Sequence, residues 1–234
     1  MVGMTNTTIE AMAQSFADAT DQHPVRRVDG ALQLSQYVLK VDAIALTILP
    51  ASDGRPHLVS NIGYEPGVVG VYEKEWFGAT RRRISRHVSD PSGIYPWERS
   101  EFIDTEYVNE TLKPAGYRNG ITRPLTAKNG SIFGFIHTNI AKPSFDSRTQ
   151  EMFRETVDRL AHTAWAVHVR MTSGLTERER EILALIRDGL SNPEIAERLY
   201  ISRRTVATHV DHLMRKTGTR SRAHTAAWAV RYGF

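Results

Sequence analysis

Cysteine is absent from the 234-residue sequence. The chain therefore has no disulfide, no thiol nucleophile and no thiolate metal ligand. No basic N-terminal segment leads into an apolar run, and no stretch approaches the roughly eighteen apolar residues of a membrane-spanning helix. These absences lead us to expect a soluble cytoplasmic protein with no membrane partner.

Motifs that carry catalysis are also missing. The sequence contains no Gly-x-Ser-x-Gly elbow, no phosphate-binding loop and no His-Glu-x-x-His pair. Its nine histidines show no metal-ligand spacing, since His162 and His168 would point to different faces of one helix. We therefore expect no enzyme activity, no catalytic residue, no metal site and no cofactor.

Charge is divided unevenly along the chain. The 30 Lys and Arg residues against 26 Asp and Glu give a net charge of +4. From Leu175 onward there are 11 basic and 7 acidic residues, which leaves 19 of each before that point. The whole surplus thus lies on the C-terminal segment, where it favours attraction to a phosphate backbone. Because the surplus is small, we expect weak binding by one copy and therefore a homodimer.

The segment 202–216 predicts a helix with two different faces. Val206, Val210 and Leu213 recur at helical spacing and form an apolar stripe. The opposite face mixes cations with small and hydrogen-bonding side chains, as a helix that reads DNA bases requires. The candidate DNA-binding residues are Arg203, Arg204, Thr205, Ala207, Thr208, Asp211, Arg215 and Lys216.

Helix-start signals punctuate this part of the chain at four positions: Thr176, Ser191, Ser202 and Ser221. Glu179 and Glu194 stand three residues after the first two, which indicates capping boxes. Only Tyr200 and Ile201 separate the predicted second helix from Ser202, so the two helices must meet at a tight angle. A scaffold helix, a short turn and a basic second helix predict a helix-turn-helix.

Several motifs cover nearly all of the last sixty residues: Leu175-Thr-Glu-Arg-Glu-Arg-Glu-Ile-Leu, Gly189-Leu-Ser-Asn-Pro-Glu-Ile-Ala, Ile201-Ser-Arg-Arg-Thr-Val, Thr208-His-Val, Leu213-Met-Arg-Lys-Thr-Gly and Ser221-Arg-Ala. Together they closely resemble the LuxR-type (also called NarL-type) DNA-binding domain. The resemblance implies a four-helix module whose third helix enters the major groove and whose fourth helix often dimerises. Family members commonly carry Lys or Arg where this chain has Ala207 and Asp211, so we expect a different base preference.

The first 170 residues alternate helices with two hairpins. Helices are predicted at 5–20, 30–40, 65–77 and 146–169, and strands at 44–48, 57–62, 116–125 and 131–140. Asn129-Gly130 is a strong hairpin signal. The predicted fold class is α+β, with an N-terminal α/β/α sandwich on an antiparallel sheet and a C-terminal all-α four-helix helix-turn-helix domain.

This N-terminal part resembles the GAF-type sensory domain. The motifs that carry the resemblance are Val41-Asp-Ala-Ile-Ala-Leu-Thr-Ile-Leu-Pro, Leu58-Val-Ser-Asn-Ile-Gly-Tyr and Gly130-Ser-Ile-Phe-Gly-Phe. The resemblance implies a GAF-like ligand-sensing and dimerisation domain over residues 1–170. A linker at 171–174 would then lead to the DNA-binding domain at 175–234.

Aromatic residues gather in the middle of the chain, where 9 of the 20 lie between Tyr64 and Tyr117. In a GAF-like fold this stretch covers one face of the sheet, and Tyr and Trp are typical linings of a ligand pocket. Ordinary core packing explains the same residues equally well. The candidate ligand-binding residues are Tyr64, Tyr72, Trp76, Tyr95, Trp97, Phe102, Tyr117 and Phe135.

Together these features favour a one-component transcriptional regulator. Its partners would be a pseudo-palindromic operator in double-stranded DNA and an unknown small-molecule effector, and RNA polymerase is a further candidate. An alternative is an acyl-homoserine-lactone receptor of the quorum-sensing LuxR type, which Asp90-Pro91 and Tyr95-Pro-Trp97 resemble, although Tyr72-x-x-x-Trp76 reverses the order expected there. A response regulator with an atypical N-terminal domain is a weaker alternative, because a receiver domain would alternate strands and helices.

Overall fold

The computed structural model describes residues 14–15, 18, 23–49, 56–71, 93–99 and 101–234. The chain divides into two compact units, Met1–His168 and Val169–Phe234. The predicted helix at 5–20 lies almost entirely outside the described residues, and so does the predicted helix 65–77 beyond residue 71. Among the described helices, none has the length and apolar character needed to cross a membrane.

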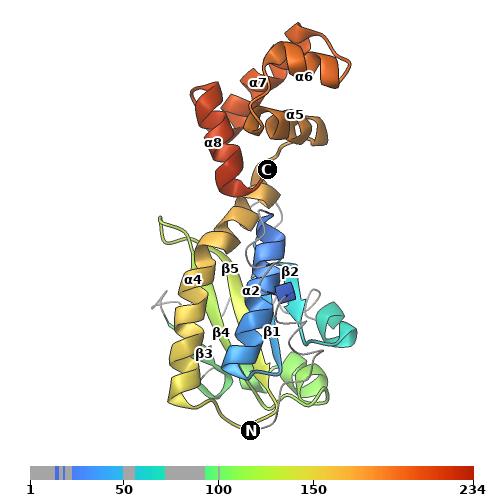
Figure 1. Cartoon of the computed structure of the whole chain (residues 1–234). Coiled ribbons are helices and arrows are strands. Elements are labelled where there is room, and N and C mark those ends of the chain that lie inside the picture. The colour runs from blue at the N-terminus through green and yellow to red at the C-terminus, as the bar shows by residue number, and fades with distance from the viewer. Residues whose placement is uncertain (1–13, 16–17, 19–22, 50–55, 72–92, 100) are drawn as a thin grey trace. The chain divides into compact units, whose positions relative to one another are not determined.

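The first unit is built on an antiparallel sheet (Figure 1). Its strands, as far as the structure describes them, are β1 (Ala43–Ile48), β2 (His57–Ile62), β3 (Tyr95–Pro96), β4 (Asn119–Thr126) and β5 (Ile132–Ile140). They lie in the order β2-β1-β5-β4-β3, and every described pairing is antiparallel. The predicted antiparallel sheet is confirmed, and the strand–helix alternation of a receiver domain is not seen in this part of the chain.

The β4–β5 hairpin turns where Asn129-Gly130 predicts. The Ala127 N–H donates to the Ser131 carbonyl at 2.8 Å, and Gly130 has φ +82°. A turn that ends in a left-handed residue favours glycine at that position, since a Cβ would be strained there. The hairpin places β5 at the centre of the sheet, between β4 and β1.

One face of the sheet is covered by two helices, α2 (Pro24–Leu39) and α4 (Ser147–Thr172). Ile44, Leu46 and Ile48 alternate along β1 and pack into this core, which includes Phe153 of α4. The prediction that α2 begins at Gly30 was wrong, because Pro24 occupies its first turn, where a missing N–H costs nothing. Helix α4 also extends three residues beyond the predicted end at 169.

The other face carries small and polar side chains together with a second apolar cluster. This cluster contains Ala43 from β1, Phe135 from β5 and Trp97. It is completed by a helical stretch at 66–71 and by short helical segments at Trp97–Arg99, Glu101–Asp104 and Tyr107–Leu112. The described parts of the predicted helical excursion between the hairpins therefore lie against this face, which is the side away from α4.

The second unit contains four helices after the end of α4: α5 (Glu177–Arg187), α6 (Asn192–Arg198), α7 (Arg203–Thr217) and α8 (Arg222–Tyr232). Each starts at its predicted cap, Thr176, Ser191, Ser202 or Ser221. Both predicted capping boxes form, with Glu179 and Glu194 closing them. The predicted α+β fold class, with an all-α C-terminal domain, is confirmed.

Candidate nucleic-acid interface and ligand pocket

Helix α7 separates its side chains into a buried stripe and an outer face. Val206, Val210 and Leu213 are buried in the core of the C-terminal unit. The outer face is exposed at Arg203, Arg204, Thr205, Thr208, Asp211, Arg215 and Lys216, and half-buried at Ala207. Ser202 fixes the start of the helix, because its hydroxyl accepts from the Thr205 N–H at 3.0 Å. The helix is therefore held from one side and presents the other to a partner.

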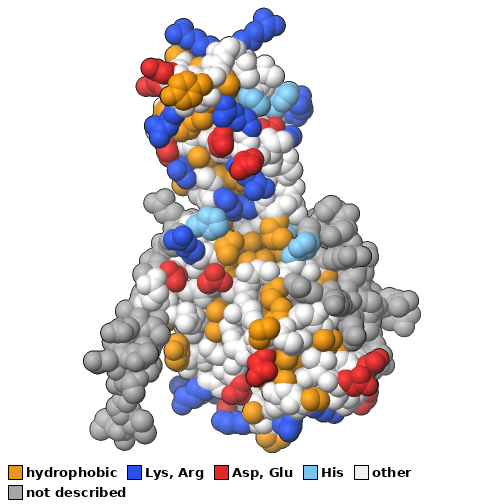
Figure 2. All heavy atoms as spheres, turned by 90° about the vertical axis from the view of Figure 1, so that its right-hand side faces the viewer, with side chains coloured by type: hydrophobic (Ala, Val, Ile, Leu, Met, Phe, Trp, Pro, Cys, Tyr) orange, Lys and Arg blue, Asp and Glu red, His pale blue; other side chains and the backbone are white. Residues whose placement is uncertain are grey.

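Some cations of this unit make hydrogen bonds within it, and others do not. Arg187 donates to the Phe234 carbonyl at 2.6 Å, and Arg222 donates to Asn192 at 2.9 Å. By contrast, no ion pair or side-chain hydrogen bond within the described residues 101–234 involves Arg203, Arg204 or Arg215 of α7. On the face drawn in Figure 2, Lys and Arg side chains lie over much of this unit. Unpaired cations on an exposed helix are suited to contact with phosphate.

Lys216 differs from its neighbours on α7. Its ammonium lies 2.6 Å from Glu179 Oε2 and donates to the Gly174 carbonyl at 3.0 Å. Glu179 is buried and also accepts from the Thr176 N–H at 2.8 Å. Burial by itself raises the Glu179 pKa, but the hydrogen bonds from Lys216 and Thr176 outweigh it and lower the pKa. Lys216 thus bonds inside the domain, whereas it was predicted to contact DNA.

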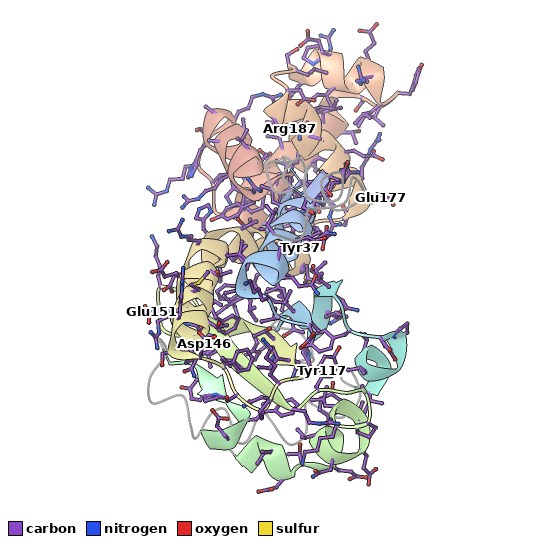
Figure 3. All side chains as sticks on the ribbon, turned by 60° about the horizontal axis from the view of Figure 1, so that its bottom comes forward. Tyr37, Tyr117, Asp146, Glu151, Glu177 and Arg187 are labelled. Carbon is purple, nitrogen blue, oxygen red and sulfur yellow. The ribbon has the colours of Figure 1, made fainter. Side chains whose placement is uncertain are left out.

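A pocket lies on the sheet face opposite α4. Its described lining comes from four strands and from the helical segments that cover them: Ala45, Leu58, Tyr64, Val68, Val69, Trp97, Tyr107, Leu112, Thr122, His137, Thr138 and Asn139. Trp97 lies against β4 at Gly120, where an added Cβ would come within 3 Å of the indole nitrogen. Tyr117, which Figure 3 labels, belongs with Trp97 to the apolar cluster on this face of the sheet.

Polar groups of the pocket are joined in hydrogen bonds to one another. Thr122 Oγ1 lies 2.8 Å from His137 Nδ1, and Thr47 Oγ1 lies 3.4 Å from His137 Nε2. The Tyr64 hydroxyl donates to Asn139 Oδ1. Burial lowers the pKa of His137 to about 3, so the imidazole is neutral at physiological pH. No charged side chain appears among the lining residues that the structure describes.

The cavity of this pocket is small. Its free volume is about 30 Å³, which is enough for a water molecule but not for a metabolite. A larger ligand could be accommodated if the described segments that cover the sheet, 63–71, 97–99 and 101–117, moved away from it.

Comparison with known proteins identifies the second unit. Residues 173–229 match the family described as bacterial regulatory proteins, luxR family. The C-terminal domain belongs to the LuxR family. LuxR-type matches include the transcriptional regulatory protein LnrK of Bacillus subtilis, which is 51% identical over 59 residues, covering 25% of this chain and 27% of LnrK. The chain thus spans about a quarter of the length of LnrK.

Two further proteins are similar over longer stretches. The transcriptional regulatory protein LiaR of Bacillus subtilis is 30% identical over 151 residues, covering 64% of this chain and 66% of LiaR. The crystal structure of Escherichia coli SdiA is 19% identical and covers 97% of this chain and 98% of that one, with a TM-score of 0.46. The LuxR-family relatives named here are transcriptional regulators, not enzymes.

Predicted contact residues of the LuxR-type domain lie on one helix, α7, as expected. Thr208 donates to the Arg204 carbonyl at 3.1 Å, which holds its hydroxyl against its own helix. On α8, Ala229 is buried and Ala226 packs against the domain core, so neither side chain is available to a second copy. Val230 is 66% exposed and remains available on the outer side of that helix.

The structure places four of the eight predicted ligand-binding residues in or beside the pocket. Tyr64 and Trp97 line the pocket, and Tyr117 and Phe135 lie in the adjoining apolar cluster. Tyr95 is half-buried on β3 and does not line it. The following predicted residues lie outside what the structure describes, the last in its side chain only: Tyr72, Trp76 and Phe102. Asp90, on which the lactone-receptor alternative depends, also lies outside the described residues.

Sequence reasoning missed the polar half of the pocket. His137 and Asn139 alternate along β5 with the core residues Ile136 and Ile140, and Thr122 follows the core residue Ile121 on β4. That alternation is visible in the sequence, because polar residues at period two along a central strand indicate a face that is not ordinary core. A search for hydrogen-bonding residues on that period would have found them.

Proposed function

We propose that this protein is a one-component transcriptional regulator, in which a small molecule bound by the N-terminal domain modulates DNA binding by α7. The observation that carries the proposal is the outer face of α7. There, three arginines without partners in the described domain stand over a buried apolar stripe, on a LuxR-type domain. Cations in this position neutralise phosphates, and Thr208 and Asp211 lie between them at positions from which bases are read.

Two copies of the chain are expected to bind one operator. The excess of basic over acidic residues in the C-terminal segment is only four, so one copy contributes modest electrostatic affinity. The exposed residues Ala223, Ala227 and Val230 follow one stripe of α8 and offer a flat apolar surface to a second copy. A two-fold dimer of this kind would bind a pseudo-palindrome with half-sites about one helical turn apart.

The N-terminal domain supports ligand sensing through the pocket on its sheet. An uncharged lining with a buried hydrogen-bonding network fits a small organic molecule better than a metal ion or a highly charged metabolite. Opening of the covering segments on binding would supply the conformational change that a regulator needs. We expect the resulting change in DNA affinity to correspond to a coupling of about 1–3 kcal/mol.

Native mass spectrometry of freshly purified full-length protein tests both parts of the proposal. We expect a dimer mass, with an additional small mass that disappears on denaturation. Fluorescence anisotropy with labelled duplex DNA then provides the binding measurement. Loss of binding in the Arg203→Ala/Arg204→Ala double variant, with an unchanged melting temperature, would support α7 as the contact surface. A wild-type protein that binds duplex no better than bovine albumin would refute it.

A further inference from the structure

Tyr200, in the turn between α6 and α7, is 95% exposed. It is the most exposed large hydrophobic side chain among the residues that the structure describes. Its backbone is left-handed, with φ +53°, and Lys40 is the only other described non-glycine residue with positive φ. This conformation is unfavourable for a residue that carries a Cβ, so the position is costly for tyrosine.

The turn itself explains why the left-handed conformation is needed. The Ile201 N–H donates to the Ala196 carbonyl at 3.0 Å, and the Tyr200 N–H donates to the Glu197 carbonyl at 3.3 Å. These two hydrogen bonds form a Schellman motif, which ends a helix with one left-handed residue. Ile201 and Ala196 both belong to the domain core, so this turn fixes the angle between α6 and α7.

The other three helices of the domain end in the same way but with glycine. Gly189 after α5, Gly218 after α7 and Gly233 after α8 have φ of +88°, +68° and +68°. Each is followed by a residue whose N–H donates to the carbonyl five positions earlier, as in the turn after α6. Glycine is the favoured residue here. Tyrosine at the fourth such position gives up that advantage, and its exposed ring gains almost no packing within the domain.

Basic residues flank Tyr200 in the sequence. Arg198 precedes it by two residues, and Arg203 and Arg204 follow it, all exposed and without an ion pair among the described residues. Glu197 is the one exposed acid within four residues of it. The local charge therefore favours an anionic partner, and the turn immediately precedes the first turn of α7.

We propose that Tyr200 is a DNA-backbone contact, in which the ring lies along a deoxyribose and the hydroxyl donates to a phosphate oxygen beside Arg203. Tyrosine hydroxyls are among the groups that make such contacts, which fix the register of a protein on the duplex. The proposal rests on the proposed function, since it takes α7 as the helix that enters the groove. It explains why this turn has tyrosine where its three counterparts have glycine.

Because a phosphate contact does not depend on base sequence, the probe is a fluorescein-labelled 30-base-pair duplex of random sequence. Three full-length proteins are compared with the wild type: Tyr200→Gly, Tyr200→Phe and Arg204→Ala. We expect Tyr200→Gly to raise the calorimetric Tm by about 2–4 °C, because strain is relieved. The same variant should bind the duplex about tenfold more weakly, with an unchanged salt slope.

Tyr200→Phe keeps the strain and the ring, so it should leave Tm unchanged and lose most of that affinity through the hydroxyl alone. A glycine variant with full affinity would overturn the proposal, and so would one with a lowered Tm, since the ring would then support the fold. Arg204→Ala separates the two claims. If it weakens binding while Tyr200→Gly does not, the Tyr200 contact is wrong and the proposed function stands. If the wild type fails to bind the duplex, the proposed function itself fails.

Discussion

Lys216 Nζ lies 2.6 Å from Glu179 Oε2, and this ion pair ties the last turn of α7 to the first turn of α5. The Glu179 carboxylate also closes the capping box with Thr176, so one buried group serves two helices. The contact lies at the opposite end of α7 from Arg203. A cation in the helix proposed to bind DNA therefore acts on the orientation of that helix, whereas its neighbours face outward.

Replacing Lys216 with methionine should destabilise the C-terminal domain by about 2–3 kcal/mol, because the Glu179 carboxylate would be left buried without its charged partner. Arg215→Met is the matched control, since Arg215 is exposed and has no partner in the described domain. We expect the control to leave stability unchanged and to reduce the salt slope of DNA binding by about one unit. Hydrogen exchange of the α5 and α7 amides measures the first effect. Equal stability of the two variants would contradict the structural role of Lys216.

His137 should make the N-terminal domain sensitive to mild acid. Its pKa is about 3 in the folded state, because burial disfavours the charged imidazole, and about 6.5 in an unfolded chain. Stability is therefore complete above pH 6.5 and declines as the pH falls toward 3, since only the unfolded state binds the proton. The loss at pH 5 should be about 2 kcal/mol.

Urea unfolding at pH 5 and pH 8, followed through exchange of the sheet amides, measures that loss. His137→Gln should remove most of the difference between the two pH values, whereas His162→Gln, at an exposed position on α4, should preserve it. A pH dependence that survives in His137→Gln would show that another group is responsible.

Gly120→Ala should disturb the pocket. The added methyl group would come within 3 Å of the Trp97 indole nitrogen and of Asn139 Nδ2, so both lining side chains must shift. We expect a destabilisation of about 1–3 kcal/mol from this overpacking, together with a change in tryptophan emission. Gly67→Ala is the control, because nothing lies within 4 Å of its added Cβ and alanine favours the helix there. Identical thermal unfolding of the two variants would show that Trp97 is not held against β4.

Arg204 and Asp211 should differ in what they contribute to DNA binding. Arg204→Ala would remove the proposed phosphate contact, so it should weaken binding to all sequences alike and reduce the salt slope by about one unit. Asp211 can accept from cytosine N4, so Asp211→Ala should relax base preference at one position of each half-site, by about 1–3 kcal/mol. Competition with sequence-randomised half-sites distinguishes the two effects. Uniformly stronger binding by Asp211→Ala would show that the carboxylate only repels phosphate.

Local signals predicted the C-terminal domain well because its structure is decided locally. Each N-cap needs only a hydroxyl that reaches a backbone N–H three residues later, as Ser202 does with Thr205 at 3.0 Å. The stripe of Val206, Val210 and Leu213 fixes which side of α7 is buried. Helix α8 has no comparable stripe, since alanines are spread around it. Its orientation is decided by packing against α5 and α7, which buries Ala229 and leaves Ala226 half-buried.

The pocket depends on contacts between distant parts of the chain. Tyr64 is hydrogen-bonded to Asn139, which lies 75 positions later in the sequence. Thr47 lies beside His137, which is 90 positions later. Aromatic content alone indicated Tyr64 and Trp97, because large amphipathic rings are typical of both pockets and cores. Which strands would pair, and hence which polar residues would meet under those rings, follows from the order β2-β1-β5-β4-β3. Short-range patterns do not specify that order.

Operator recognition by α7 can be measured by enriching bound DNA from a fully randomised duplex library with the full-length protein. We expect a two-fold-related pair of half-sites about one helical turn apart, and a weaker but unchanged motif with Arg204→Ala. Absence of any enriched motif, with equal recovery of single-stranded and duplex DNA, would contradict the proposal that α7 reads an operator as part of a dimer.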